Sequence, residues 1–243
     1  MSEFHLKCSS ADIAKGVILV GDPRRAELAS TLLDEPRLVN SSRGLLIYTG
    51  KYNGTEVTVA TTGMGAPSAA IVLEELCNLG ASAFIRVGSA GGVAPRLNSG
   101  DLVVATAAVR EDGTSLSYLR PTFPAVSDVE LLNIVVQSAK NIHPGVLSGI
   151  VLSHDAFYRK LPDDELEKLC MAGVLAQEME TSCIFIIAEF RRVRAAALFA
   201  IGGNLRRPEE RSMEAFQKAE KEALEIGLHS IVEVSRRGLA GLK

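Results

Sequence analysis

Arg86 is the residue in this chain whose charge most clearly requires a partner of opposite charge. In the stretch Ala83–Gly92 (AFIRVGSAGG) it lies in an apolar run that predicts a buried strand, and a loop of small residues, Gly88–Gly92, follows. A buried guanidinium requires an anion or a carboxylate close by. The loop exposes backbone N–H groups and the Ser89 hydroxyl at the carboxyl end of the strand, where open α/β sheets bind ligands. We therefore expect Arg86 and Ser89 to hold a phosphate; the alternative is a structural arginine, salt-bridged within the sheet.

Arg25 follows another predicted strand, Val17–Val20, across the turn that begins at Gly21. Pro23 opens a helix there, since proline is favoured in a first helical turn. The N–H groups and the dipole at the start of a helix favour anions, whereas a cation in the first turn opposes the dipole. An anion bound by both the helix and Arg25 explains this placement. The alternative is an arginine that is simply exposed to solvent.

Two carboxylates, Glu178 and Glu180, follow a short predicted strand, Val174–Gln177. On an extended backbone they point to the same side, where they repel unless hydroxyls or cations pair with them. The adjacent hydroxyls of a ribose are natural donors to one of them. The competing interpretation, which the spacing alone favours, is the start of a helix enriched in acidic residues.

The elements that must position these residues alternate between strands and helices. Residues 45–50 and 56–61 predict a hairpin around Tyr52-Asn53-Gly54, and residues 111–127 predict a long irregular connection. Other strands are predicted at Leu102–Val109, Val146–Leu152 and Ala195–Ile201, and helices at 23–33, from the glycine loop 63–68 through Leu79, and at Val129–Ala139, Asp163–Met171, Thr181–Phe190 and Met213–Val234. The pattern indicates an α/β class with a mixed, largely parallel sheet, as one domain over residues 1–243.

The composition excludes several classes of function. The chain has 243 residues, 47% of them hydrophobic, and a net charge of −3, which provides for one large core but no basic footprint for nucleic acid. Its four cysteines and four histidines show no zinc-like spacing. We expect no secretory signal, because MSEFHLKCSS lacks a charged segment followed by an apolar one, and no apolar run approaches the roughly 18 residues of a membrane span. We expect a cytoplasmic protein with no metal site and neither nucleic acid nor membrane as partner.

Several motifs occur in order over nearly the whole chain. They are His5, GDPRR at 21–25, Arg43 within 40–44, GMGAPS at 63–68, RVGSAGG at 86–92, SHDAFY at 153–158 and QEMETS at 177–182. A single one of these is weakly specific, but the ordered set resembles the nucleoside phosphorylase family, which includes uridine phosphorylase and the hexameric purine nucleoside phosphorylases. The resemblance implies a three-layer α/β/α sandwich around a mixed, partly barrel-like sheet.

The resemblance also implies a site with three parts. It implies a phosphate site at Gly21, Arg25, Arg43, Arg86 and Ser89, a ribose site at His5, Met179 and Glu180, and a base site at Phe157, Gln177 and Glu178. In that family the counterparts of Arg43 and His5 are lent across a dimer interface, and the dimers build hexamers. We therefore expect a homo-oligomer in which Arg86 and Glu180 carry the catalysis.

The implied reaction is phosphorolysis of a nucleoside. Phosphate attacks C1′, the N-glycosidic bond breaks, and an oxocarbenium-like ribosyl cation develops. Three arginines orient the phosphate beside that cation, so catalysis consists mainly of positioning and electrostatics. Inorganic phosphate is the co-substrate, and no metal or organic cofactor is required.

The chain departs from the family at the base. Purine-cleaving relatives carry a Ser-Asp pair that protonates the purine, whereas this chain has Gly202-Gly203-Asn204. Uridine phosphorylases read uracil with a Gln-x-Arg soon after Phe-Tyr, but here 159–162 (RKLP) follow. Arg159 or Lys160 is a candidate replacement, and the alternative is a solvent-facing charge on the loop. The stretches 109–115 and 123–126 are similar to uridine phosphorylase segments and favour uridine.

Other functions remain as alternatives. Within the family these are a purine nucleoside or methylthioadenosine phosphorylase, and from another class a non-catalytic nucleoside-binding relative. A dinucleotide-dependent oxidoreductase is disfavoured, because Gly63-x-Gly65 lacks the third glycine of that fingerprint.

Overall fold

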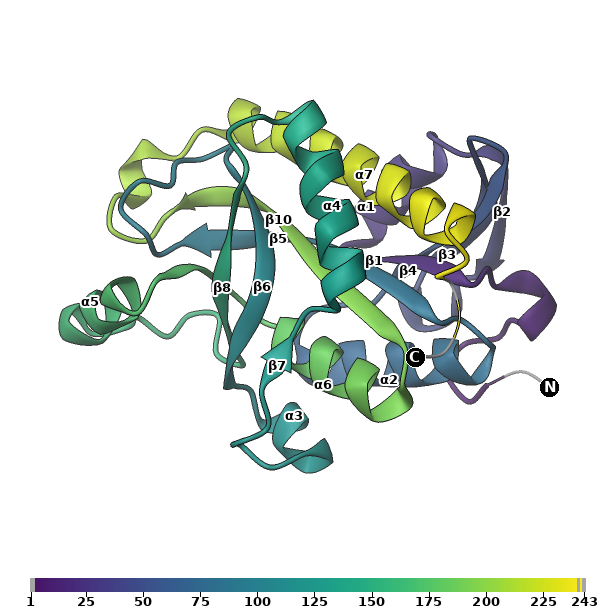
Figure 1. Cartoon of the computed structure of the whole chain (residues 1–243), viewed down its shortest axis with the longest axis horizontal. Coiled ribbons are helices and arrows are strands. Elements are labelled where there is room, and N and C mark those ends of the chain that lie inside the picture. The colour runs from purple at the N-terminus through teal and green to yellow at the C-terminus, as the bar shows by residue number, and fades with distance from the viewer. Residues whose placement is uncertain (1–2, 240, 242–243) are drawn as a thin grey trace.

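The structure, a computed structural model, describes residues 3–239 and 241 and combines one large sheet with helices on both of its faces (Figure 1). The strands are β1 Gly16–Val20, β2 Asp34–Asn40, β3 Ile47–Tyr52, β4 Thr55–Thr61, β5 Ala83–Gly92, β6 Leu102–Glu111, β7 Ala125–Val126, β8 Leu147–His154, β9 Val174–Glu178 and β10 Arg194–Asn204. The helices are α1 Pro23–Ser30, α2 Ala66–Asn78, α3 Gly113–Tyr118, α4 Val129–Ile142, α5 Asp163–Met171, α6 Thr181–Arg191 and α7 Met213–Arg236.

Part of the sheet closes on itself. The strand order is β10-β6-β8-β9-β5-β1-β4-β3-β2, and β10 also pairs with β5, so that β5, β9, β8, β6 and β10 form a closed barrel. From β5 the sheet continues through the parallel strands β1 and β4, and the antiparallel strands β3 and β2 complete it. Because β10, β5, β1 and β4 are parallel, their carboxyl ends meet at one edge of the sheet.

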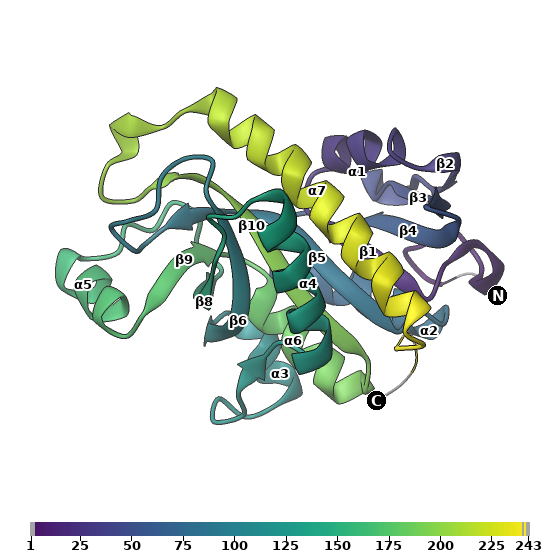
Figure 2. The same cartoon turned by 45° about the horizontal axis from the view of Figure 1, so that its top comes forward.

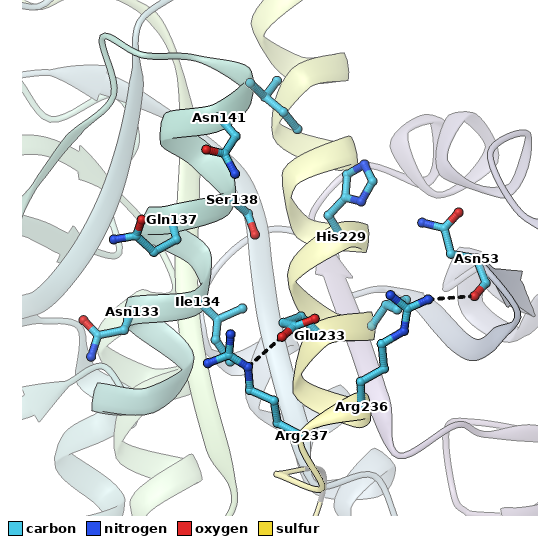
Figure 3. A pocket seen from close by; sticks show the side chains of 12 residues that line it. Asn53, Asn133, Ile134, Gln137, Ser138, Asn141, His229, Glu233, Arg236 and Arg237 are labelled. Atoms are coloured by element: carbon cyan, nitrogen blue, oxygen red, sulfur yellow. Dashed lines mark hydrogen bonds and ion pairs between the residues drawn. The ribbon is translucent and has the colours of Figure 1, made fainter.

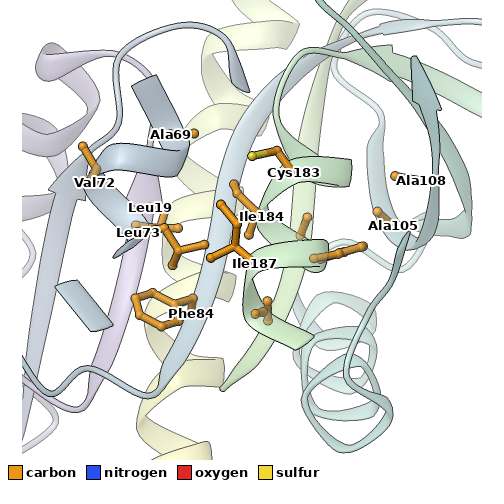
Figure 4. Close-up of a cluster of buried hydrophobic side chains, with 14 of the residues drawn as sticks. Leu19, Ala69, Val72, Leu73, Phe84, Ala105, Ala108, Cys183, Ile184 and Ile187 are labelled. Atoms are coloured by element: carbon orange, nitrogen blue, oxygen red, sulfur yellow. The ribbon is translucent and has the colours of Figure 1, made fainter. Parts of the chain in front are cut away.

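Two apolar clusters join the helices to the sheet and confirm the expected three layers. On one face, Phe84 packs with Leu73 of α2 and Ile184 of α6 in one cluster (Figure 4). On the other face, Ile85 belongs to a second cluster that includes residues of α1, α4 and α7 (Figure 2). Residues 181–188 of α6 are all buried, as expected of a helix without a solvent-facing stripe.

The predicted hairpin is confirmed at its turn. Asn53 and Gly54 both have positive φ, 49° and 77°, between β3 and β4. Two positive values at the central positions are typical of the tight turn that Asn-Gly favours, whose twist matches that of the strands. The sequence therefore predicted both strands and the turn that joins them.

The prediction of a loop at Gly88–Gly92 is wrong, because β5 continues through it. Gly88 pairs with Phe199 of β10, and Gly91 pairs with Gln177 of β9, so that this part of β5 has a neighbour on each edge. A Cβ on Gly88 would lie 2.8 Å from the Phe199 ring. The small residues allow close packing inside the barrel.

Two further predictions need correction. Residues 111–127 are not wholly irregular: they contain α3 and β7, and the Arg110 guanidinium fixes the segment by donating to the carbonyl oxygens of Leu119, Arg120 and Phe123 at 2.6–2.8 Å. β2 was not predicted, because it is a mostly exposed, polar edge strand that contains Pro36. In the described part of the chain, the helices are all too short or too polar to cross a bilayer.

Candidate active site

Arg86 is buried in the middle of β5, with 4% of its surface exposed. Its Nη2 donates to Glu180 Oε2 at 2.6 Å, and its Nη1 donates to Thr62 Oγ1 at 3.0 Å. Its Nε is buried without a hydrogen-bond partner. The carboxylate that a buried guanidinium requires is therefore present, and the guanidinium keeps one donor unused.

Glu180 connects three separate segments. It is the N-cap residue of α6, and its Oε1 accepts a hydrogen bond from the Gly65 backbone N–H at 2.6 Å while Oε2 receives Arg86. Gly65 has a φ of 87°, a conformation that favours glycine. Glu180 is only 4% exposed, so this carboxylate is held at a fixed position where β5, the segment after β4 and α6 meet.

Glu178 has a different role from Glu180. It ends β9, and its carboxylate accepts hydrogen bonds from the Ser153 hydroxyl and from the backbone N–H groups of Glu180 and Thr181 at 2.9–3.0 Å. Burial, followed by the charge of Glu180, raises the pKa of Glu178 above its ordinary value. Glu178 thus caps the start of α6, which agrees with the interpretation as an acidic helix start, and the backbone at Glu180 has already left the extended conformation (φ −140°, ψ −21°).

Gly21 and Arg25 lie beside Arg86 at the carboxyl end of β1. A Cβ on Gly21 would lie 3.4 Å from Arg86 Nη2, so the glycine leaves the guanidinium accessible from that side. Arg25 Nη1 approaches the Val87 carbonyl oxygen at 3.4 Å, and its Nη2 forms an ion pair with Glu220 of α7. Arg25 is therefore not simply exposed, since the structure brings it to β5 with a carboxylate partner.

Three of the residues expected at the phosphate and ribose do not contact Arg86 within the chain. Ser89 is exposed on β5. Arg43 is exposed in a 3-10 turn with a φ of 58°. His5 is held on α2 by Glu75, whose Oε1 lies 2.6 Å from His5 Nδ1. His5 is thus anchored on α2, and Arg43 is exposed at the surface of the chain.

The residues expected at the base lie partly on an exposed loop. Phe157 is 69% exposed and Tyr158 is 94% exposed, and their rings meet edge to face. Gln177 faces Gly91 across the pairing of β9 with β5, and its Oε1 is buried without a partner. Met179 is half-buried between the two carboxylates.

Arg159 and Lys160 follow Phe157 on the same loop. The Arg159 guanidinium bridges Glu111 and Glu165 at 3.2 and 2.9 Å, and Lys160 is exposed. Arg159 is therefore tied to β6 and α5 by surface ion pairs, as expected of a charge on a solvent-facing loop.

The sequence assigned no role in the site to four residues that organise it: Thr62, Gly65, Ser153 and Glu220, of which Gly65 and Ser153 lie within the motifs GMGAPS and SHDAFY. Thr62 and Gly65 follow β4. Because parallel strands end at the same edge of a sheet, their position after a predicted strand could have placed them near Arg86. Ser153 ends a strand of the barrel, and Glu220 lies on a distant helix with nothing in its local sequence that marks it.

A groove of about 460 Å³ lies elsewhere, between α4 and α7 (Figure 3). Asn133, Gln137 and Asn141 line it from α4, and Asn53 lines it from the hairpin turn. Asn53 precedes β4, whereas the site lies after it, so the groove is at the opposite edge of the parallel strands. Among the described residues, no group of three or more His, Cys, Asp or Glu side chains is placed to bind a metal ion.

Comparison with known proteins identifies the family. A family model described as the phosphorylase superfamily matches residues 15–233. The chain is 37% identical to uridine phosphorylase of Thermococcus kodakarensis, over 94% of this chain and 85% of that protein, and 37% identical to guanosine phosphorylase of Halorubrum lacusprofundi, over 83% of each. The crystal structure of uridine phosphorylase from Vibrio fischeri superposes with a TM-score of 0.90 at 30% identity, covering 96% of this chain and 98% of that one. The chain therefore belongs to the nucleoside phosphorylase family, within the phosphorylase superfamily.

Proposed function

We propose that this enzyme cleaves the N-glycosidic bond of a nucleoside with inorganic phosphate, and that uridine is its preferred substrate. A phosphate oxygen attacks C1′, the C1′–N bond breaks with its electron pair leaving on the base, and the products are the free base and ribose 1-phosphate. One observation carries the proposal. Arg86 and Glu180 form a buried pair, 2.6 Å apart, with Gly21 beside it, where an added Cβ would lie 3.4 Å from Arg86 Nη2.

The pair suits a reaction that brings an anion to a developing cation. Arg86, Arg25, Gly21 and Ser89 would bind the phosphate, while Glu180 would accept hydrogen bonds from the ribose hydroxyls and Met179 would pack against the sugar. In a buried site, donors that are already fixed stabilise charge without reorganising when the bond breaks. Holding phosphate and C1′ together also removes the entropic cost of a bimolecular encounter.

The site requires a second copy of the chain in this proposal. His5 is held by Glu75 and Arg43 is exposed, and neither is a hydrogen-bond partner of Arg86 or Glu180. A neighbouring subunit would supply its Arg43 to the phosphate and its His5 to the 5′-hydroxyl of the ribose. We therefore propose a hexamer built from dimers, acting in nucleoside salvage in the cytoplasm, with phosphate as co-substrate and no cofactor.

Asn204 supports uridine over a purine nucleoside. It occupies the region where purine-cleaving relatives carry a proton-donating aspartate, but its Nδ2 donates to the carbonyl oxygens of Ala94 and Leu97 at 2.8–2.9 Å. Its Oδ1 accepts from the Arg206 backbone N–H at 3.0 Å. With the carboxamide fully engaged, Asn204 is unsuited to protonate a purine. The similarity to guanosine phosphorylase keeps a purine nucleoside as the second candidate.

A phosphorolysis panel tests the proposal. Uridine, thymidine, inosine, adenosine and methylthioadenosine are each incubated with the enzyme, with and without phosphate, and release of the base is measured. We expect release that requires phosphate and is fastest with uridine. Equal release without phosphate would show a hydrolase. Binding of ribose 1-phosphate without turnover of any nucleoside would show a non-catalytic relative.

A further inference from the structure

Glu75 is a buried carboxylate that the proposed reaction does not use. It lies on α2, is 7% exposed, and accepts hydrogen bonds from the backbone N–H groups of His5 and Leu6 at 2.7–3.1 Å. Its Oε1 also lies 2.6 Å from Nδ1 of the His5 ring. Burial by itself raises the pKa of Glu75, but the hydrogen bonds from Leu6 and His5 outweigh it and hold that pKa below its ordinary value. Glu75 is therefore ionised at neutral pH.

The charge of Glu75 decides which nitrogen of the His5 ring carries the hydrogen. An ionised carboxylate has only acceptors, so Nδ1 of the ring is the donor in this contact. In a neutral imidazole the other nitrogen, Nε2, then keeps its lone pair and is an acceptor. The His5 side chain is 23% exposed. The nitrogen that His5 can offer to another molecule is therefore Nε2, in the form that accepts a hydroxyl hydrogen.

The segment that carries His5 is fixed against the turn that carries Arg43. The backbone N–H of Lys7 donates to Asn40 Oδ1 at 2.8 Å, and Asn40 Nδ2 donates to the Leu45 carbonyl oxygen at 2.6 Å. Asn40 is buried and thus joins the His5 segment to the 3-10 turn of Arg43. These contacts set the path of the backbone, and the carboxylate on α2 then sets the orientation of the His5 ring.

We propose that Glu75 is a positioning residue for the ribose, because it presents His5 Nε2 as an acceptor to the 5′-hydroxyl group of a nucleoside bound in the neighbouring subunit. This inference rests on the proposed function, in which His5 serves the site of a second copy. The 5′-hydroxyl group donates a hydrogen bond to Nε2, and no covalent bond changes in this contact. Glu75 thereby helps to orient the ribose, which keeps C1′ in line with the attacking phosphate.

The test compares uridine with 5′-deoxyuridine, in which a hydrogen atom replaces the 5′-hydroxyl group. We expect wild-type kcat/KM to be about tenfold higher for uridine, the effect of one hydrogen bond. His5→Ala should bring this ratio close to one. Glu75→Gln has a single acceptor oxygen for the N–H groups that the carboxylate binds, so the ring loses its fixed orientation and the ratio should fall to within about threefold. The double variant should have the same ratio as His5→Ala, since Glu75 acts through the ring.

The matched control is Glu74→Gln, on the adjacent residue of α2, whose carboxylate pairs with Arg191. It should leave the ratio unchanged. A general loss of stability or of subunit assembly lowers kcat/KM for both substrates alike, so the ratio separates positioning from a structural role. A Glu75→Gln enzyme that prefers uridine as strongly as the wild type does would overturn the proposal.

Nitrogen NMR of the histidine rings tests the same point without turnover. At a pH at which the rings are neutral, the His5 signal, identified by its loss in His5→Ala, should show hydrogen on Nδ1 and none on Nε2. Glu75→Gln should change this signal, whereas Glu74→Gln should not. Hydrogen on Nε2 in the wild type would refute the role of Glu75 even in an active enzyme. If no nucleoside is cleaved, the proposed function fails, and the spectrum still decides whether Glu75 orients the ring.

Discussion

The two ends of the proposed nucleoside site are built in opposite ways. At the phosphate and ribose end, Arg86 and Glu180 are each 4% exposed and hydrogen-bonded to one another inside the sheet. At the base end, Phe157 and Tyr158 are on a loop and are mostly exposed, and Gln177 has a buried Oε1 without a hydrogen-bond partner. The phosphate and ribose end is fixed by interactions within the protein, whereas the aromatic side chains of the base end are exposed on a loop.

This difference follows from what each end has to do. Stabilising charge in a transition state requires dipoles and charges that are already in place, so the groups around phosphate and C1′ belong on strands and helix starts. Recognising a base requires only that a ring be held and read, which loops on a rigid scaffold do well. The arrangement allows different bases to be bound on one scaffold, and the relatives of this chain include a uridine phosphorylase and a guanosine phosphorylase.

The largest effect is expected from Arg86→Met. It leaves the Glu180 carboxylate buried without its cation, which typically costs about 3–5 kcal/mol of unfolding free energy. It also removes the proposed main phosphate donor, so kcat/KM should fall by about 10³-fold or more. Urea unfolding and a phosphorolysis assay measure the two effects.

Two further variants separate the effect of the unpaired charge from the loss of the arginine. Arg86→Met combined with Glu180→Gln should recover most of the stability but none of the activity, because the unpaired charge is gone. Arg159→Met, which breaks exposed ion pairs at the base end, should change stability by about 1 kcal/mol or less. Equal losses from Arg86→Met and Arg159→Met would contradict the contrast between the two ends.

Glu178→Gln tests, through pH, the buried carboxyl group that accepts the Glu180 backbone N–H. Burial and the charge of Glu180 raise the pKa of Glu178 above its ordinary value of 4.5. A carboxyl group with a raised pKa contributes stability that is fully present below pH 4.5 and is lost as the pH rises through its folded pKa. Glutamine does not titrate, so wild-type stability minus variant stability should decline with rising pH, by about 1.4 kcal/mol per unit within that window. A difference that stays level or grows with pH would exclude a raised pKa.

The sequence predicted most of the fold because its signals are local. Asn53-Gly54 specified a turn with two positive φ values, and apolar periodicity located α5 at Asp163–Met171, as observed. The errors have a common cause in tertiary structure. Gly88–Gly92 has the composition of a loop, and becomes a strand only because β9 and β10 pair with its two edges.

The site was only partly predictable for the same reason. The buried guanidinium of Arg86 required an anion, and strand-end geometry placed Gly21 and Arg86 together. The pairing of Arg86 with Glu180 joins residues 94 apart in sequence, and nothing local to either specifies it. Glu220 was missed as the partner of Arg25, since a glutamate on a long amphipathic helix has no feature that distinguishes it from its neighbours.

At the base end, Phe157→Ala should raise the KM for the nucleoside about tenfold, because an aromatic ring stacked on a base contributes about 1–3 kcal/mol. Stability should change by no more than about 0.5 kcal/mol, since the side chain is mostly exposed. Tyr158→Ala, on the more exposed neighbour, is the matched control and should leave KM nearly unchanged. A loss of stability comparable with that of Arg86→Met would mean that the loop is as fixed as the phosphate end.

The smallest effect is expected at Glu220. Its carboxylate holds Arg25 in position, which favours phosphate binding, but its negative charge competes with phosphate for the guanidinium. The Arg25 side chain is 10% exposed and paired with Glu220, so phosphate has to share the guanidinium with a carboxylate. Glu220→Gln keeps a hydrogen-bond acceptor there but removes the competing charge, and should lower the KM for phosphate about threefold, the size expected of a partly exposed charge. Glu220→Ala removes the acceptor as well and lets Arg25 move, so the KM for phosphate should rise instead. If both variants change this KM in the same direction, Glu220 affects phosphate binding only by its charge or only by positioning Arg25. The proposal that the two effects oppose each other would then be wrong.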